Sequence, residues 1–514
     1  MTEDQKTIQE LREQILVLQQ QLDWFKRQLF GKKGEQFQHP DLFGDPEAGK
    51  PAPSSEDESP EEGDAANAKK NRPGKKRNTR AAALPKDLPL RTEVIDPEEV
   101  LRDPAAWRLI DEDPREWLEK DPGYFYLIRK IYRTYVPLND PVEGKALTAP
   151  APPTIIENGF WGPGLLSEVL CNRFLYHLPY DRQQKLYSNR FGIHLPKQTM
   201  SDAALKVADQ LGLLTTLMKR DMLACGYIRA DETEARYLDS NEPGGSSTGR
   251  FWLYKALSGN VLFDWQLDRK HHHLFDWLGP DFQGILGSDA YEAYPKYCLA
   301  QRLKGKVAKR AACLAHIRRK YETALKQKPH LAAWYLKIFG QIYQIEATLK
   351  EMKADEQIKV RYRRRYSLPL LKLIHRANQH LRDRKAALPA GRLGQAISYT
   401  LNQWEEVLTY IDHGQVEIDN NGVERDVRPV AIGRKNYLFV GSPEAGDRSA
   451  VLYSLLISAR HHGVDPEAYL REVIERLPGC GSNEAALREL LPENWAAAHK
   501  SDQNNLSDQQ QAVA

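Results

Sequence analysis

The sequence has no paired cysteines, no long hydrophobic run and almost no net charge. Its 73 Lys and Arg residues nearly balance 70 Asp and Glu residues, which leaves a net charge of +3. This balance argues against a wholly polycationic protein of the histone type, so any basic function must be local. The five cysteines are scattered and include no CxxC pair. They indicate neither a disulfide framework nor a zinc finger, and we expect reduced thiols.

No stretch approaches the roughly 18 uncharged apolar residues that span a bilayer. The first residues, MTEDQKTIQE, also lack the apolar run of a signal peptide. We therefore expect a cytoplasmic protein with no membrane partner. The chain does contain 41% hydrophobic residues and ten tryptophans, which is typical of a globular protein. Its 514 residues predict three or four structural units at roughly 150 residues each.

Residues 1–37 are predicted to form a helix that self-associates. Apolar residues recur there alternately three and four positions apart, namely Ile8, Leu11, Ile15, Leu18, Leu22, Phe25 and Leu29. That spacing is typical of a coiled coil. The alternative is an amphipathic helix that docks on its own chain.

Residues 38–83 are rich in Pro, Gly, Ser and Ala and are predicted to be a disordered linker. The linker carries a basic cluster that includes Lys75, Lys76 and Arg77. These side chains are candidates for contacts with phosphates, although composition alone fits a solvated charge run equally well. The last residues, 501–514, are predicted to be a disordered tail.

The segment after the linker is expected to be β-rich and then helical. Residues 84–150 include GYFYLIRKIYRTYV, whose aromatic and β-branched residues predict strands in a small module. Residues 151–222 read as helical, with a break at Gly192 like that of a helix-turn-helix DNA-binding region. A packed helical hairpin that does not bind DNA explains the same pattern.

From residue 223 to residue 448 the pattern predicts a mixed α/β sheet. Strands are expected in CGYIRAD, GRFWLYKAL, NVLFDWQL, QGILGSD and KRAACLAH. A helical subdomain is expected as an insertion at about 321–411, and residues 449–500 should form a C-terminal helical region.

Three acidic residues in this region are candidates for catalysis. Asp231 and Asp289 each end a predicted strand, although either one alone is an ordinary place for a surface carboxylate. In EIDNNGVERDVRPVAIGRKN, at 417–436, Asp419 or Asn420 can cap a helix that carries Glu424. The alternative for this helix is a simple ion pair between Glu424 and Arg428.

Two Asp and one Glu are the hard oxygen ligands that Mg²⁺ prefers. Two such ions, Mg²⁺ or Mn²⁺, can activate the attacking oxygen and stabilise the leaving oxygen in phosphoryl transfer. The order of strand Asp, strand Asp and helix Glu suits a ribonuclease-H-like core.

Several segments closely resemble the transposases of the insertion sequence 66 family. They are YIRADET at 227–233, ILGSDAYEAY at 285–294, CLAHIRRKY at 313–321 and EIDNNGVERDVRPVAIGRKNYLFVGS at 417–442. The resemblance extends over most of the chain apart from the linker and the tail, and the block around Glu424 is the most specific part.

The resemblance implies a DDE transposase with a ribonuclease-H-like core. The implied activity is metal-dependent cleavage at the terminal inverted repeats of an insertion sequence, followed by strand transfer into target DNA. The implied partners are double-stranded DNA, further copies of the chain as a homodimer or higher oligomer, and accessory proteins of the same element. A location at the nucleoid follows from the DNA substrate.

The resemblance also assigns roles to individual residues. Asp231, Asp289 and Glu424 match the catalytic, metal-binding positions. The residues that match basic motifs of the family, and that we assign to DNA positioning, are His316, Arg319, Lys320, Arg425, Arg428, Arg434, Lys435 and Asn436. Two alternatives remain: an end-binding protein or repressor with an inactive core, and a structure-specific nuclease that cleaves without joining.

The chain departs from the family in one respect. Many members carry a cysteine-rich, zinc-finger-like module before the core, whereas residues 84–150 contain no cysteine, so we expect no zinc there.

Two further motifs are a run of histidines and a run of arginines. His271, His272 and His273 are adjacent and should point in different directions on a helix, which disfavours a shared metal. The arginines at 361 and 363–365 fit either phosphate contacts or a solvated helix face.

Overall fold

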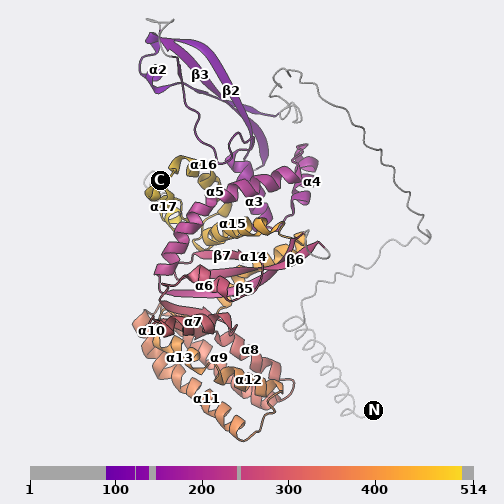
Figure 1. Ribbon diagram of the computed structural model, residues 1–514, viewed down its shortest axis with the longest axis vertical. Coiled ribbons are helices and arrows are strands. Elements are labelled where there is room, and N and C mark those ends of the chain that lie inside the picture. The colour runs from indigo at the N-terminus through magenta and orange to yellow at the C-terminus, as the bar shows by residue number, and fades with distance from the viewer. Residues whose placement is uncertain (1–87, 122, 138–145, 240–244, 500–514) are drawn as a thin grey trace, which may run out of the picture. The chain divides into compact units, whose positions relative to one another are not determined.

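A computed structural model describes residues 88–121, 123–137, 146–239 and 245–499. The predicted coiled-coil helix, the whole linker and the tail lie outside these ranges, as do Lys75, Lys76 and Arg77. The described residues form a mixed α/β structure with two sheets (Figure 1).

The first sheet lies in the segment where the sequence predicts strands. Its strands are β1 (Leu90–Ile95), β2 (Trp107–Asp121), β3 (Tyr124–Pro137) and β4 (Leu147–Thr148), with α2 (Glu98–Arg102) and η2 (Pro104–Ala106) between β1 and β2. β3 lies at the centre, parallel to β1 and antiparallel to β2 and β4. Aromatic and β-branched residues of β3 supply buried positions of this sheet, together with Leu118 and Glu119 of β2.

Three helices follow the first sheet, as predicted. They are α3 (Pro163–Phe174), α4 (Tyr180–Phe191) and α5 (Lys197–Ala224). Gly192 ends α4 in a left-handed conformation with φ of 66°, which glycine adopts without strain. α5 buries one apolar face along its length, including Val207, Leu211 and Leu214. The helix-turn-helix role of α4 and α5 stays a prediction.

The second sheet has the strand order β7-β6-β5-β8-β9. Its strands are β5 (Tyr227–Leu238), β6 (Ser246–Ala256), β7 (Val261–Gln266), β8 (Gly284–Ser288) and β9 (Ala308–Ala312), and the connecting helices are α6 (His272–Leu278) and α7 (Ala293–Leu303). β5, β6 and β7 pair antiparallel, whereas β8 and β9 run parallel to β5. Each strand overlaps a segment predicted from the sequence, but only β7 and β8 lie inside theirs. β5 continues seven residues beyond the predicted end at Asp231, and β6 and β9 begin before their predicted segments.

Helices cover both faces of this sheet (Figure 1). On one face, Phe251 and Phe263 pack against Tyr453 of α15 (Pro443–His461). On the other face, Trp252 contacts Tyr294 of α7, and Tyr254 stacks on Trp277 of α6. Because side chains alternate along a strand, odd-numbered residues of β5 and β6 face α15 and even-numbered residues face α6 and α7.

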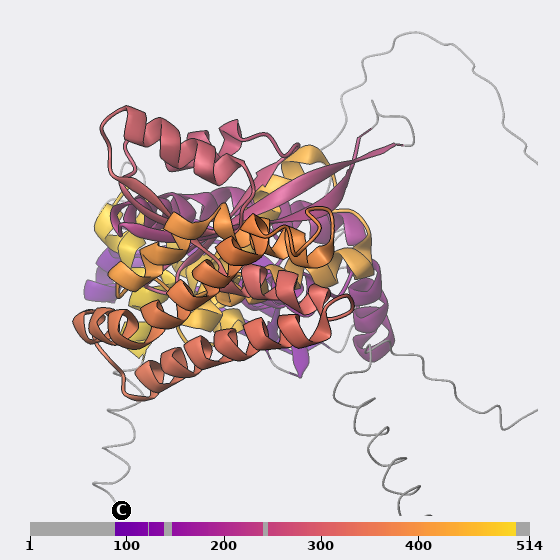
Figure 2. The same ribbon diagram turned by 90° about the horizontal axis from the view of Figure 1, so that it is seen from below.

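A helical subdomain separates β9 from the C-terminal helices. It consists of α8 (Leu314–Ala324), α9 (Pro329–Glu351), α10 (Glu356–Tyr362), η3 (Arg363–Ser367), α11 (Leu368–Asp383), α12 (Arg392–Leu401) and α13 (Trp404–Asp412). Figure 2 looks onto these helices, which pack side by side. Their core includes Ile317, Tyr321 and Phe339 and continues into the sheet at Tyr227 and Ile285. Helices therefore occupy the region where the insertion is predicted, and its status as an insertion into a ribonuclease-H-like core stays a prediction.

Arg363 corrects one interpretation of the arginine run. Its side chain is 2% exposed, and the guanidinium donates to both carboxylate oxygens of Glu346 at 2.9 and 2.8 Å. It also donates to the carbonyl oxygens of Tyr410 and His413. Arg363 is a buried structural side chain, so the phosphate-contact prediction is wrong for this residue.

The chain then returns to the second sheet. α14 (Asn421–Tyr437) packs on β5 and α15 packs on β7, followed by α16 (Pro466–Cys480) and α17 (Glu484–Glu489). Two serines of α15 bond to the outer edge of β7: Ser458 Oγ accepts from the Val261 N–H and Ser454 Oγ accepts from the Phe263 N–H, at 2.9 and 2.8 Å. No helix in the described ranges is long and apolar enough to cross a membrane.

Candidate active site

Asp231 and Asp289 lie level with each other on neighbouring parallel strands. β5 and β8 pair in a register that matches Tyr227 with Ile285. Asp231 lies four residues beyond Tyr227, and Asp289 lies four residues beyond Ile285. Equal steps along parallel strands bring the two side chains to the same face and the same height. They meet at the carboxyl edge of β8, where open α/β sheets commonly bind ligands.

α14 is fixed beside these aspartates by its buried polar residues. The side-chain amide of Asn420, immediately before the helix, donates to the carbonyl oxygen of Ala230 at 2.7 Å. Two residues beyond Glu424, the buried carboxylate of Asp426 accepts from Lys255 of β6 at 2.7 Å and contacts His461 of α15 at 2.7 Å. Glu424 lies between these two anchors, in the first turn of α14.

The first turn of α8 also lies beside Asp289 and the start of α14. β8 and β9 pair Ser288 with Ala312, so Cys313 follows β9 at the level of Asp289. The Asn420 N–H donates to Cys313 Sγ at 3.2 Å, and the Leu314 N–H donates to the carbonyl oxygen of Ile418 at 3.1 Å. These bonds join the start of α8 to the segment that enters α14.

Two α8 side chains therefore contact Glu424. His316 Nε2 lies 3.7 Å from Glu424 Oε1, and Arg319 Nη2 donates to Glu424 Oε2 at 3.3 Å. Within the described residues Glu424 makes no ion pair with Arg428, so the alternative of a simple pair along the helix is not what the structure contains. Both α8 residues were assigned to DNA positioning from the resemblance, and the structure brings them to the carboxylates.

The carboxylates are close enough to perturb one another. The pKa of Asp231 is raised to about 7, first by burial and then by the negative charges of Glu232, Asp289 and Glu424. The Glu232 backbone N–H, which donates to Asp231 Oδ1 at 2.9 Å, lowers it in part. Burial also lowers the pKa of His316, so its imidazole is mainly neutral at pH 7. A cluster in which like charges raise a carboxylate pKa favours a bound cation.

The residues present fit a divalent cation. Asp231, Asp289 and Glu424 supply carboxylate oxygens, which Mg²⁺ and Mn²⁺ prefer. Glu424 Oε1 is a buried atom with no hydrogen-bond partner among the described residues. A buried carboxylate oxygen without a donor is costly, and a cation beside it would remove that cost.

Glu232 is a buried carboxylate on the far side of the strand from Asp231, and sequence reasoning missed it. It follows Asp231 on β5 and points to the opposite face of the sheet, where its side chain is 4% exposed. It forms an ion pair with Arg269 and accepts from Tyr294 Oη at 3.2 Å. Its only signal in the sequence was its place beside Asp231, and its partners lie far along the chain.

Arg310 is another residue near the site that sequence reasoning did not identify. This buried side chain of β9 donates from Nη1 to the carbonyl oxygen of Asp289 at 2.8 Å. Its Nη2 donates to Gln403 Oε1 at 2.9 Å, just before α13. Arg310 therefore ties the backbone at Asp289 to the helical subdomain.

The remaining predicted DNA-positioning residues divide between two places. Arg425 and Arg428 are exposed on α14, close to Glu424 in the same helix. Lys320 lies on α8, and its Nζ is 5.2 Å from the centroid of the Tyr399 ring. Arg434, Lys435 and Asn436 lie about 15 Å further along α14, at its other end. There Arg434 donates to the carbonyl oxygen of Glu234, and Asn436 accepts from Arg182 of α4.

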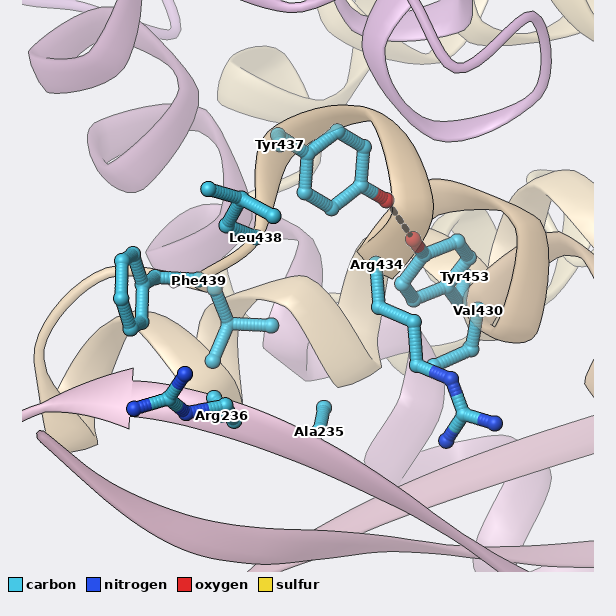
Figure 3. Close-up of a pocket in the computed structure, with 9 residues that line it drawn as sticks. Ala235, Arg236, Val430, Arg434, Tyr437, Leu438, Phe439 and Tyr453 are labelled. Atoms are coloured by element: carbon cyan, nitrogen blue, oxygen red, sulfur yellow. Dashed lines mark hydrogen bonds between the residues drawn. The ribbon is translucent and has the colours of Figure 1, made fainter.

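A small cavity lies at that far end of α14 (Figure 3). It is lined by side chains of β5, α14 and the segment after it, and the hydroxyls of Tyr437 and Tyr453 bond to each other beside it at 2.5 Å. Its volume of about 10 Å³ accommodates a single water molecule. No candidate carboxylate lines it, so it is a packing feature and not the catalytic pocket.

The histidine run differs in part from expectation. The rings of His272 and His273 lie 4.0 Å apart, and with Asp276 their ligand atoms come within 4.8 Å of one another. The prediction that adjacent histidines must point apart is therefore wrong for this pair. His273 already bonds to the carboxylate of Asp268 at 2.6 Å.

An α/β domain that gathers three carboxylates at the edge of parallel strands, beside exposed arginines, has the features of an enzyme acting on nucleic acid. Comparison with family models gives the class directly. A model described as "Transposase IS66 family" matches residues 158–448, more than half of the chain. The chain therefore belongs to the IS66 family of transposases.

Two further models match other parts of the chain. One described as "IS66 C-terminal element" matches residues 454–492, and one described as "Transposase C of IS166 homeodomain" matches residues 17–94. The second of these supports a DNA-binding region that lies largely outside the described residues.

Relatives of similar length occur in Sinorhizobium fredii (strain NBRC 101917 / NGR234). "Uncharacterized protein y4jD" is 30% identical over 432 residues, which cover 80% of this chain and 82% of that protein. "Uncharacterized protein y4hP" is 28% identical over 438 residues, which cover 80% and 76% respectively. The likeness thus extends well beyond the candidate site.

Proposed function

We propose that this transposase is a DDE enzyme that cleaves DNA at the terminal inverted repeats of its insertion sequence and joins the released 3′ ends to target DNA. One observation carries the proposal: Asp231 and Asp289 lie level on neighbouring parallel strands, and Asn420 ties the start of α14 beside them. Burial raises the pKa of Asp231, and the charges of Asp289 and Glu424 raise it further. Side chains that repel one another in this way are costly unless a cation or a reaction uses them.

The sheet supports a ribonuclease-H-like core. Three antiparallel strands followed by two parallel strands, in the order β7-β6-β5-β8-β9, place the first two acids on adjacent central strands. The helix that carries the third acid packs across β5. In this proposal the helical subdomain is an insertion between the second and third acids.

Two divalent ions, Mg²⁺ or Mn²⁺, would be held by Asp231, Asp289 and Glu424. When bound, such ions lower the pKa of an attacking water or hydroxyl and offset charge on the phosphate. The chain's own residues bind and orient the DNA. Arg425 and Arg428 are exposed next to Glu424 and are free to contact phosphates, and Arg310 holds the backbone at Asp289.

The experiment uses full-length protein and a duplex that carries the inverted repeats flanking its own gene. With Mg²⁺ or Mn²⁺ present, we expect nicked and joined products on a denaturing gel. Asp289→Ala and Glu424→Ala should each lower product formation by at least 100-fold while the shifted complex on a native gel persists. Glu351→Ala, an exposed acid at the end of α9, is the matched control and should keep full activity.

Other outcomes separate the alternatives. A wild-type protein that shifts the duplex without nicking it is an end-binding protein or repressor. One that nicks without joining is a nuclease. Full activity of the Asp289→Ala protein would contradict the proposed site.

A further inference from the structure

His316 faces the carboxylates from a fourth chain segment. Its Nε2 lies 3.7 Å from Glu424 Oε1, too far for a hydrogen bond and close enough for both atoms to contact one bound ion or water. The two side chains are 25% and 30% exposed, so water reaches the gap only in part. The atom of Glu424 that points to His316 is the buried oxygen without a hydrogen-bond partner.

The position of His316 is fixed by structure on both sides. Leu314 and Ile317 of the same helix are fully buried in the core of the helical subdomain. The bonds from Asn420 to Cys313 Sγ and from Leu314 to Ile418 tie the helix start to the segment before Glu424. These bonds hold the helix that carries His316 beside the helix that carries Glu424, as a shared ion would require.

Nothing in the described residues engages the other ring nitrogen. His316 Nδ1 is buried and has no hydrogen-bond partner there. A histidine that served only to brace Glu424 would form a direct hydrogen bond with it, which the 3.7 Å separation does not allow. The ring is thus held by packing, and Nε2 is left free to bind an ion beside Glu424. The ring proton would then lie on Nδ1, where a ligating histidine usually donates to a carbonyl, a carboxylate or a water.

We propose that His316 is a ligand, through Nε2, of the divalent ion that Glu424 binds. The inference rests on the proposed function, because it adds a nitrogen donor to the same metal centre. Mg²⁺ strongly prefers oxygen donors, whereas Mn²⁺ accepts an imidazole nitrogen more readily. The centre should therefore bind Mn²⁺ more tightly than a site made of carboxylates alone.

Metal binding tests this without any catalytic assay. Metal-free full-length protein is titrated with Mn²⁺ while electron paramagnetic resonance follows the free ion. We expect His316→Ala to weaken one Mn²⁺ site by about 10-fold or more, and Glu424→Ala to weaken it at least as much. His330→Ala, an exposed histidine on α9, is the control and should bind as the wild type does.

A spectroscopic readout on the wild-type protein does not depend on how a variant folds. Pulsed electron paramagnetic resonance of bound Mn²⁺ should show coupling to an imidazole ¹⁴N nucleus, and His316→Ala should abolish it. His316→Asp should restore binding with the preference shifted toward Mg²⁺.

The outcomes distinguish the two proposals. If the wild type binds Mn²⁺ without nitrogen coupling, and Glu424→Ala alone weakens binding, His316 is not a ligand and the proposed function stands. If wild-type protein binds no Mn²⁺ at all, the metal-dependent function itself is wrong.

Discussion

At the scale of single residues, the second sheet buries carboxylates outside the candidate site as well. Asp264 of β7 is the clearest case, and its carboxylate accepts from Gln266 Nε2 at 2.9 Å. Burial raises its pKa to about 6, although Gln266 and Lys219 of α5 lower it in part. A raised pKa means that the folded state keeps the proton to higher pH than the unfolded state does.

We predict that Asp264→Asn stabilises the protein at neutral pH. The wild type holds the favourable contribution of protonated Asp264 below pH 4 and loses it as the pH rises through about 6. Asparagine does not ionise, so the variant should gain roughly 2 kcal/mol in free energy of unfolding over the wild type between pH 4.5 and pH 7.5. Urea unfolding at both pH values measures this difference, and a difference that stays constant with pH would contradict it.

At the residue scale, the sequence places two of the three acids correctly in their elements. Asp289 follows β8 and Glu424 lies in the first turn of α14, as expected. Asp231 instead lies inside β5, which continues to Leu238, so the prediction that it ends a strand is wrong. The catalytic role of all three stays a prediction.

Glu232 and Arg310 were missed because their roles depend on burial and on partners distant in sequence, Arg269 and Gln403. An arginine in a predicted strand gives no sign that its guanidinium will be enclosed.

At the scale of elements, β2 is the main strand that was not predicted from the sequence. Its sequence, WRLIDEDPREWLEKD, is highly charged and contains Pro114, which argues against a strand. β2 lies at the edge of its sheet, where a missing N–H is tolerated, and its acids pair across to β3. Glu112 pairs with Arg133 and Glu116 pairs with Arg129. The strand thus depends on its neighbour, and propensity alone could not predict it.

Two helical glycines should respond in opposite ways to alanine. In α15, a Cβ at Gly446 would overlap the buried ring of Trp265 on β7, whereas a Cβ at Gly340 in α9 meets nothing within 4 Å. We predict that Gly446→Ala destabilises the protein by about 1–3 kcal/mol through overpacking. Gly340→Ala should stabilise it by about 0.5–1 kcal/mol through helix propensity. Chemical unfolding of both variants checks the signs, and a stabilised Gly446→Ala protein would refute the close packing of α15 on the sheet.

At the scale of the whole molecule, the candidate site draws on segments far apart in sequence. The carboxylates come from β5, β8 and α14, and the helical subdomain folds between the last two. The order of these parts was predictable, because each has its own hydrophobic pattern. Their contacts through Asn420, Cys313 and Arg310 were not, since a pattern does not specify which polar atoms meet.

The predicted coiled coil remains a prediction at this scale, because residues 1–37 lie outside the described ranges. Deletion of residues 1–31 should lower the molar mass in solution by removing the apolar seam that joins two helices. Light scattering on the full chain and on the shortened chain measures this. Equal numbers of subunits in both would show that the N-terminal helix does not mediate assembly.

The serines of α15 close the outer edge of β7 in place of a further strand. An uncovered edge exposes backbone groups that recruit strands from other molecules. A damaged gene copy that stopped before α15 would therefore encode a chain with an open edge, and we expect such a chain to aggregate. Under the proposed function, truncated copies of the gene would then yield insoluble chains that do not compete with the intact protein for DNA ends.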